Sequence, residues 1–320
     1  MELDIVIIVL SLLAILIPTF LMLSCQAQKL RKKLPPGNMG LPWIGETADF
    51  YRAHRSNRLY EDFLQPRTSE HGNIFKTRIM GEPMVVVSGV EANRFFLCNE
   101  FKLVVSSWPT SSVQLMGEDS IMATASDSHH RWLRGVFASC LNGAAALEGL
   151  APKVCSSVSA YLDRHWHGHD SIRLFPSVKR LAFAVVCECL LGIDPEPSLF
   201  EVFERVLCGV FAAAVDVPGS RFWRAKRARL ELGRKLGGVV RKRRREMEGE
   251  VGGGGGGGEG TLLGRLVMGL IRGEISEEEV TDNVVLLIFA AHDTTALALA
   301  MMCRMVAQHP DCHARLKQAG

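Results

Sequence analysis

The stretch VVLLIFAAHDTTALALAMM, residues 284–302, decides the fold of this chain. It is apolar except at its centre, where four polar side chains, residues 292–295, interrupt it. Ser276 and Glu279 form a capping-box pattern just before it, which predicts a helix that runs to about Gln308. At about 1.5 Å per residue this helix is about 45 Å long and crosses a whole domain. A transmembrane span is the alternative, but acidic and imidazole side chains at its midpoint are costly in lipid, so a core helix is favoured.

The polar interruption of this helix predicts a functional site. A buried carboxylate at Asp293 needs a hydrogen bond or a counter-charge, and the hydroxyl of Thr294 follows it directly. Ala290 and Ala291 stand just before, and their small side chains allow a flat group to approach the helix. Small residues followed by an acid and an alcohol suit a helix that flanks a cofactor and handles protons. Asp293 and Thr294 are therefore the candidate catalytic residues, and Ala290 and Ala291 the candidate cofactor contacts.

The N-terminal segment, residues 1–24, predicts a membrane anchor. No charged side chain occurs between Ile5 and Leu23, and this stretch is long enough to span a hydrocarbon core of about 30 Å. A cleaved signal peptide is the competing interpretation, but the residues before the apolar stretch are acidic where a signal peptide is basic. Basic residues follow, and the positive-inside rule then places the rest of the chain in the cytoplasm. Residues 25–48, basic and proline-rich, predict a stiff hinge before the domain of residues 49–320.

The composition agrees with a globular protein of a reducing compartment. The 320 residues are 48% hydrophobic and 22% charged, which excludes an intrinsically disordered or collagen-like chain. Lys plus Arg number 37 against 34 for Asp plus Glu, and a net charge of +3 excludes polyanion binding through overall charge. Nine cysteines are scattered without paired spacing, which argues against a secreted disulfide framework.

The rest of the domain is predicted to be mainly helical with a small β-hairpin. The hairpin consists of two β-rich runs, residues 75–79 and 84–88, around a Gly/Pro turn. Apolar periodicity and long apolar runs predict further helices. Their ranges are 90–99, 128–141, 151–165, 178–191 and 199–214. A glycine-rich stretch, residues 249–260, predicts a flexible loop.

Residues 221–245 carry twelve Lys or Arg side chains and one acidic side chain. One interpretation is a surface for nucleic acid or anionic lipid. The other is a long solvated helix that packs an apolar stripe inward, made of Phe222, Leu230, Leu236 and Val240. The second interpretation is favoured because no aromatic stacking set or nucleic-acid motif accompanies the charge. No nucleic-acid partner is therefore expected.

A histidine-rich stretch, residues 165–170, has three His side chains at alternate positions. Such spacing can chelate a metal ion. No second ligand group lies nearby in the sequence, so a solvated loop between helices is favoured and no metal site is predicted.

In several motifs the chain resembles the cytochrome P450 haem-thiolate monooxygenases. Residues 290–295 match the central-helix pattern of two small residues, any residue, an acid and two threonines, with Ala291 in place of the usual Gly. The match continues in the same order along the chain. It covers residues 34–47, the helix with His130 and Arg134, the loop of residues 216–222, and residues 308–317. The first and third of these are most similar to the plant microsomal branch that hydroxylates triterpenoids, taxane-type diterpenoids and brassinosteroid-like sterols.

The resemblance implies the α-rich cytochrome P450 fold and a monooxygenase that hydroxylates a lipophilic terpenoid or sterol with O₂. Asp293 would relay protons, and Thr294 would donate the hydrogen bond that assists O₂ cleavage. His130 and Arg134, one helical turn apart, would contact the haem propionates. Electrons would come from NADPH through cytochrome P450 reductase. The implied location is the endoplasmic reticulum membrane, crossed once, with the catalytic domain in the cytoplasm.

One part of the family pattern is missing from this sequence. The family's iron ligand is a Cys followed by any residue and Gly, and none of the nine cysteines has that context. We therefore expect this chain to carry only the N-terminal part of the family, without the haem-binding C-terminal part. It would then be an inactive truncated product or an incomplete gene model. The alternative function is a non-catalytic, membrane-tethered helical fragment that acts through its basic helix on anionic lipid or a partner.

Overall fold

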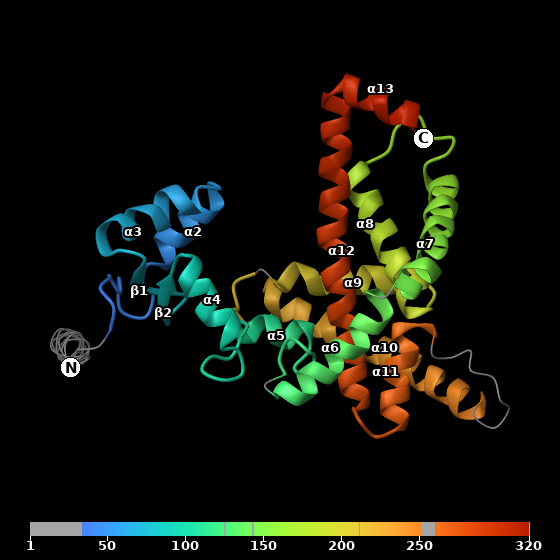
Figure 1. The fold of residues 1–320 in the computed structure, drawn as a ribbon, viewed down its shortest axis with the longest axis horizontal. Coiled ribbons are helices and arrows are strands. Elements are labelled where there is room, and N and C mark those ends of the chain that lie inside the picture. The colour runs from blue at the N-terminus through green and yellow to red at the C-terminus, as the bar shows by residue number, and fades with distance from the viewer. Residues whose placement is uncertain (1–33, 125, 143, 211, 251–259, 320) are drawn as a thin grey trace, which may run out of the picture. The chain divides into compact units, whose positions relative to one another are not determined.

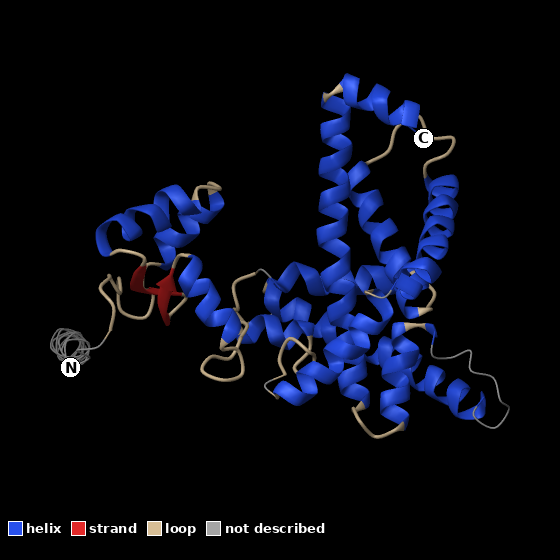
Figure 2. Ribbon diagram, viewed as in Figure 1, coloured by secondary structure: helices blue, strands red, loops and turns tan. Residues whose placement is uncertain are grey.

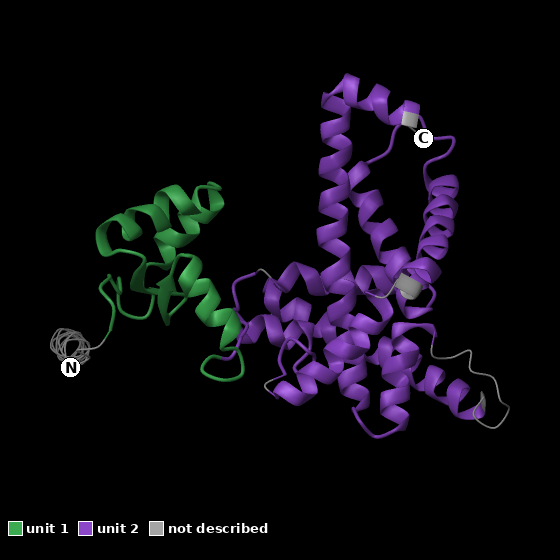
Figure 3. Ribbon diagram, viewed as in Figure 1, with its two compact units in different colours: residues 1–104 green, residues 105–320 purple. Residues whose placement is uncertain are grey.

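The computed structural model describes residues 34–124, 126–142, 144–210, 212–250 and 260–319. The predicted membrane anchor lies outside these residues, as do the basic part of the hinge and most of the glycine-rich loop. The chain divides into two compact units, residues 1–104 and 105–320 (Figure 3).

The first unit contains the predicted β-hairpin. Its elements are α2 (Thr47–Arg55), the π-helix η1 (Tyr60–Leu64), α3 (Gln65–His71), β1 (Ile74–Ile79), β2 (Glu82–Val87) and α4 (Val90–Cys98) (Figure 1). The two strands, red in Figure 2, pair antiparallel with Ile74 opposite Val87. Ala53, Phe63 and Ile79 form the small buried core of this unit.

A buried carboxylate joins the start of the first unit to its hairpin. Glu46 accepts hydrogen bonds from the guanidinium of Arg67 at 2.7 and 3.2 Å and from the hydroxyl of Thr77 at 2.6 Å. Burial alone would raise the pKa of Glu46, but the hydrogen bonds from Arg67 and Thr77 outweigh it and the pKa is lowered. The side chain of Glu46 is therefore held ionised beside its partners.

The second unit packs helices around the central helix α12. Its elements are α5 (Thr110–Met116), α6 (Asp127–Leu141), α7 (Ala144–His165), α8 (Leu174–Val185), the π-helix η2 (Val186–Leu191), α9 (Pro197–Val210), α10 (Arg221–Glu250), α11 (Leu262–Ile271), α12 (Glu277–Gln308) and α13 (Pro310–Ala319). Each predicted helix is present, with shifted ends. The run predicted as one helix over residues 178–191 falls in α8 and the wider turns of η2.

The central helix α12 begins as the sequence predicts. The hydroxyl of Ser276 accepts from the N–H of Glu279, whose carboxylate accepts from the N–H of Ser276 in return. The first half of α12 is buried in the core, and α8 runs alongside the helix (Figure 1). The second half exposes Leu297, Met301 and Met302. Among the described residues α12 is the one helix long and apolar enough to cross a membrane, a test that core helices also pass.

The basic stretch forms the helix α10, and most of the predicted apolar stripe faces the core. Phe222, Leu236 and Val240 are buried, but Leu230 is 69% exposed, so its assignment to the stripe is wrong. Leu232 and two alanines are buried in its place. Five basic side chains of α10 form ion pairs with carboxylates in the described part of the chain. These pairs and the buried stripe favour the packed-helix interpretation over a polyanion-binding surface.

Candidate functional site

His292 is the buried polar residue at the middle of the central helix. Its side chain is 0% exposed, and three phenylalanine rings lie around it at steep angles. They belong to Phe183, Phe200 and Phe203, with ring-centroid distances of 6.4, 5.9 and 5.4 Å. Desolvation lowers the pKa of His292, and the nearby carboxylates of Glu204 and Asp293 only partly oppose this effect.

Asp293 belongs to a cluster of charged side chains from three helices. Its Oδ1 atom lies 3.0 Å from Nδ1 of His292 and 3.2 Å from Nζ of Lys179 on α8. Glu204 on α9 closes the cluster, because its Oε1 lies 2.8 Å from Nζ of Lys179 and 3.7 Å from Nε2 of His292. Burial lowers the pKa of Lys179, but the hydrogen bond and charge of Glu204 and the charge of Asp293 outweigh it and raise the pKa.

The structure corrects the sequence-based expectation of a buried carboxylate at Asp293. The side chain of Asp293 is 40% exposed, and the fully buried group is its neighbour His292. Successive residues of an α-helix project about 100° apart, so only one of the two can face the core. Lys179 provides the counter-charge that we expected for Asp293 from the sequence.

Lys179 and Glu204 are candidate-site residues that sequence reasoning missed. Each is a charged residue in a helix whose buried face is largely apolar, and each is followed directly by an arginine. This pattern could have drawn attention to both residues. It does not indicate that Lys179 and Glu204 contact the same turn of α12.

Thr294 lies on the exposed side of α12. Its Oγ1 donates a hydrogen bond of 2.8 Å to the backbone carbonyl of Ala290. Ala290 is also exposed, whereas Ala291 is half-buried. Five exposed residues share this helix face, and we call them the exposed strip of α12. They are Ala290, Thr294, Leu297, Ala298 and Met301. The strip presents two alanines, a single hydroxyl and two larger apolar side chains, and the alanines leave room for a flat apolar group.

His130 and Arg134 lie on α6, as the sequence predicts. His129 on α6 contacts α12, because its Nε2 lies 2.5 Å from Oε1 of Glu279. The helix between Glu279 and Asp293 is about 21 Å long. The described contacts therefore do not bring His130 and Arg134 together with Asp293, and their role toward a cofactor stays a prediction.

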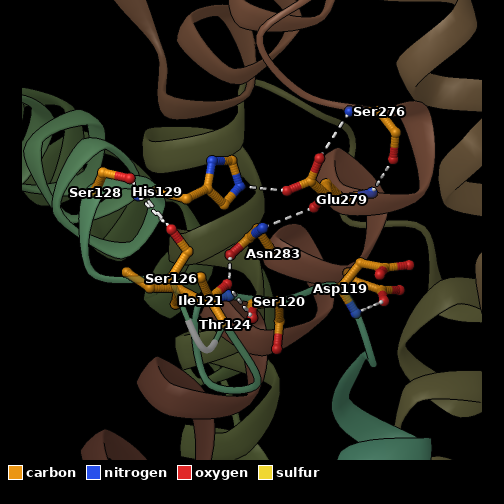
Figure 4. A network of polar contacts seen from close by, with 11 residues as sticks. Asp119, Ser120, Ile121, Thr124, Ser126, Ser128, His129, Ser276, Glu279 and Asn283 are labelled. Atoms are coloured by element: carbon orange, nitrogen blue, oxygen red, sulfur yellow. Dashed lines mark hydrogen bonds and ion pairs between the residues drawn. The ribbon is translucent and has the colours of Figure 1, made fainter. Parts of the chain in front are cut away.

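A polar network fixes the loop before α6 on the first half of α12 (Figure 4). Asn283 is fully buried, and its Oδ1 accepts the N–H of Ile121 at 2.9 Å while its Nδ2 donates to the carbonyl of Glu279 at 2.8 Å. The ring of His129 stacks on Trp132 and joins the same network through Glu279. Both ends of this loop are thus tied to α12.

Asp282 makes the second attachment of this loop. Its carboxylate accepts the N–H of Asp119 at 3.0 Å and pairs with the guanidinium of Arg229 on α10. Burial raises the pKa of Asp282, and the hydrogen bonds from Asp119 and Arg229 only partly offset this rise. Gly117, at φ +127°, passes so close that an added Cβ would lie 2.5 Å from Cβ of Asp282. The loop therefore packs tightly against α12.

Comparison with known proteins identifies the family. The family model for cytochrome P450 matches residues 35–319 of the chain. This chain belongs to the cytochrome P450 family. The predicted fold is confirmed by its similarity to a solved cytochrome P450 structure, the retinoic acid bound cyanobacterial CYP120A1. That structure is 29% identical with a TM-score of 0.73, and the match covers 89% of this chain and 62% of the other.

Plant members of the cytochrome P450 family are among the similar sequences. The taxoid 14-beta-hydroxylase of Taxus cuspidata is 33% identical over 97% of this chain and 61% of that protein. The taxane 13-alpha-hydroxylase of Taxus cuspidata is 33% identical over 89% of this chain and 59% of that protein. This cytochrome P450 chain thus spans about three fifths of the length of the curated relatives it matches.

Cytochrome P450 proteins carry haem, and the exposed strip of α12 fits one face of this group. The strip offers methyl groups and the hydroxyl of Thr294 to a flat ring, and Ala290 and Ala298 are its smallest members. The cysteines of this chain do not provide the family's thiolate ligand in the same way. Burial raises the pKa of Cys187 to about 12, so this thiol stays protonated at neutral pH. The cysteine context that the family uses for the ligand does not occur in the sequence.

Proposed function

We propose that the protein is a haem-thiolate monooxygenase that hydroxylates a lipophilic terpenoid or sterol. The observation that carries the proposal is the partly exposed Asp293 directly before Thr294 of the exposed strip of α12, in a chain that belongs to the cytochrome P450 family. The substrate class is supported by relatives whose names are taxoid and taxane hydroxylases. NADPH would supply the electrons through cytochrome P450 reductase.

The chain's own residues have separate tasks in this proposal. Haem would supply the cleavage of O₂ when it is bound through a Cys thiolate, although the family's cysteine context for that ligand does not occur in this sequence. Ala290 and Ala291 leave space for the ring beside α12, and His130 and Arg134 would bind its carboxylate groups. Thr294 holds a proton on the exposed strip, where its hydroxyl now donates to a backbone carbonyl. Asp293 comes directly before Thr294 and is partly exposed, so it takes up protons from solvent and passes them to Thr294.

The proposed location is the membrane of the endoplasmic reticulum. Residues 1–24 would cross the membrane once and hold the catalytic domain on the cytoplasmic side, where the reductase and O₂ are available. The uncharged stretch and the basic residues that follow it support this orientation. A lipophilic substrate would reach the enzyme from the same membrane.

The test uses the protein expressed from its complete reading frame and loaded with haem. Its reduced, CO-bound spectrum should show the Soret band of a thiolate ligand, and a taxane-type diterpenoid or a sterol should be hydroxylated with NADPH and reductase. The Thr294→Ala variant should lose most of its product formed per NADPH consumed, because a positioned proton donor is missing. Thr295→Ala is the matched control, since Thr295 is the adjacent exposed threonine.

Two results would contradict the proposal. A protein without the thiolate-type band would not be a haem-thiolate enzyme. Equal coupling in Thr294→Ala and Thr295→Ala would remove Thr294 from the delivery of protons.

A further inference from the structure

Buried polar atoms converge beneath Asp293 without a well-directed hydrogen bond. They are both ring nitrogens of His292, Oε1 of Glu204 and Oδ1 of Asp293. The imidazole ring stands between the two carboxylates, with Asp293 on its Nδ1 side at 3.0 Å and Glu204 on its Nε2 side at 3.7 Å. Lys179 bridges the same two carboxylate oxygens. The four side chains therefore form a closed ring of charged or polar groups.

The proton count of this cluster is not fixed by its geometry. A neutral imidazole has one N–H and can serve one carboxylate, whereas an imidazolium serves both. With Lys179 positive and two carboxylates negative, the cluster has a net charge of about −1 while His292 is neutral and about zero when it is cationic. Neutralisation of the net charge favours the extra proton, and burial among three phenylalanine rings opposes it. The cluster is thus a place where one proton can be exchanged.

A divalent metal ion is the other cation that such a cluster could hold. One ligand atom from each of Glu204, His292 and Asp293 lies within 4.8 Å of the others. However, the two carboxylates face opposite nitrogens of the ring, and a single ion bonded at about 2.0–2.2 Å can use only one of these nitrogens. The ammonium of Lys179 also occupies the space between the carboxylates. These two observations favour a proton over a metal ion.

We propose that His292 and Glu204 are positioning residues that orient Asp293 for its uptake of protons from solvent. In this proposal Nδ1 of His292 carries the N–H, 3.0 Å from Oδ1 of Asp293, and would hold this buried oxygen in the interior, although the Asp293 side chain as a whole is 40% exposed. The carboxylate therefore extends from the buried cluster to the solvent side of α12.

This inference rests on the proposed function, in which Asp293 passes protons to Thr294. Its first test does not need that function. In the chain with ¹⁵N-labelled histidine, the ring nitrogens of His292 are followed by NMR against pH. Glu204→Gln should lower the titration midpoint of His292 by about one pH unit, because a nearby negative charge is lost. Glu201→Gln is the matched control, on the same helix but exposed, and should leave the midpoint unchanged.

The second test separates positioning from packing in the haem-loaded protein. His292→Asn keeps a donor close to the Nδ1 position, whereas His292→Phe fills the aromatic surroundings without one. Product formed per NADPH consumed should be largely retained in His292→Asn and lost in His292→Phe. The dependence of this ratio on pH should differ between Glu204→Gln and Glu201→Gln. Thermal melting of each variant shows whether it is folded.

The outcomes are distinguishable. An unchanged His292 midpoint in Glu204→Gln overturns the inference, as does equal coupling in folded His292→Asn and His292→Phe. Saturable binding of Zn²⁺ alone that shifts the His292 signals, and that Glu204→Gln abolishes, would make the cluster a metal site and also overturn it. A shifted midpoint in a protein that oxidises no substrate would support the cluster and contradict only the proposed function.

Discussion

Replacement of Arg229 by Met tests whether a buried ion pair holds the second unit together. The side chains of Arg229 and Asp282 are 14% and 11% exposed, and they join α10 to α12. Met keeps much of the length of the side chain but removes its charge. The carboxylate of Asp282 is then left buried and keeps its hydrogen bond from the N–H of Asp119. Loss of one member of a buried pair costs about 3–5 kcal/mol, a large part of the 5–15 kcal/mol that stabilises a typical domain.

Two further variants separate this cost from a general effect of the substitution. In the double variant Arg229→Met with Asp282→Asn, the unpaired charge is gone and an amide oxygen still accepts from Asp119. We expect this variant to lose only about 1–2 kcal/mol. Arg241→Met is the matched control, because Arg241 joins the same two helices through Glu277. Those side chains are 56% and 30% exposed, and such a pair contributes about 0–1 kcal/mol.

Urea unfolding followed by far-ultraviolet circular dichroism measures all three variants, and the midpoints are compared at equal slopes. The reasoning fails if Arg229→Met is within about 1 kcal/mol of Arg241→Met. It also fails if the double variant is no more stable than Arg229→Met, since the cost would then not come from an unpaired buried charge.

Two other predictions concern stability. Because the pKa of Glu46 is lowered in the folded state, its contribution is present above the ordinary titration range of Glu and is lost as the pH falls through the lowered value. Glu46→Gln should therefore destabilise the protein at pH 7, and urea unfolding should show no difference from the parent protein in strong acid. Gly117→Ala should cost about 1–3 kcal/mol by crowding Asp282, whereas Gly135→Ala in α6, where nothing lies within 4 Å, should stabilise by about 0.5–1 kcal/mol. Thermal melting that ranks these two variants the other way would refute the close packing of the loop.

The helices could be predicted because their signals are local. The capping box of Ser276 and Glu279 needs only residues three apart, and the hairpin needs only its turn and two β-rich runs. The stripe of α10 shows the limit of this reasoning. Leu230 is exposed although it is apolar, while Ala225 is buried although it is small. In a helix rich in Lys and Arg, the buried face is set by what packs against it, and a single apolar residue does not reveal that face.

The same limit explains what the sequence could and could not say about the site. Polar residues that break an apolar run pointed to one turn of α12, so Asp293 and Thr294 could be proposed without a structure, and their catalytic role stays a prediction. The hydrophobic pattern is nearly uniform around that helix, so it could not show that the core encloses His292 in preference to Asp293. Lys179 and Glu204 become partners only when α8 and α9 pack on α12, which is a tertiary event. The charge environment of the proposed acid is therefore set by residues distant in sequence. A change at Glu204, outside every motif by which the chain resembles its family, is the sharpest way to perturb it.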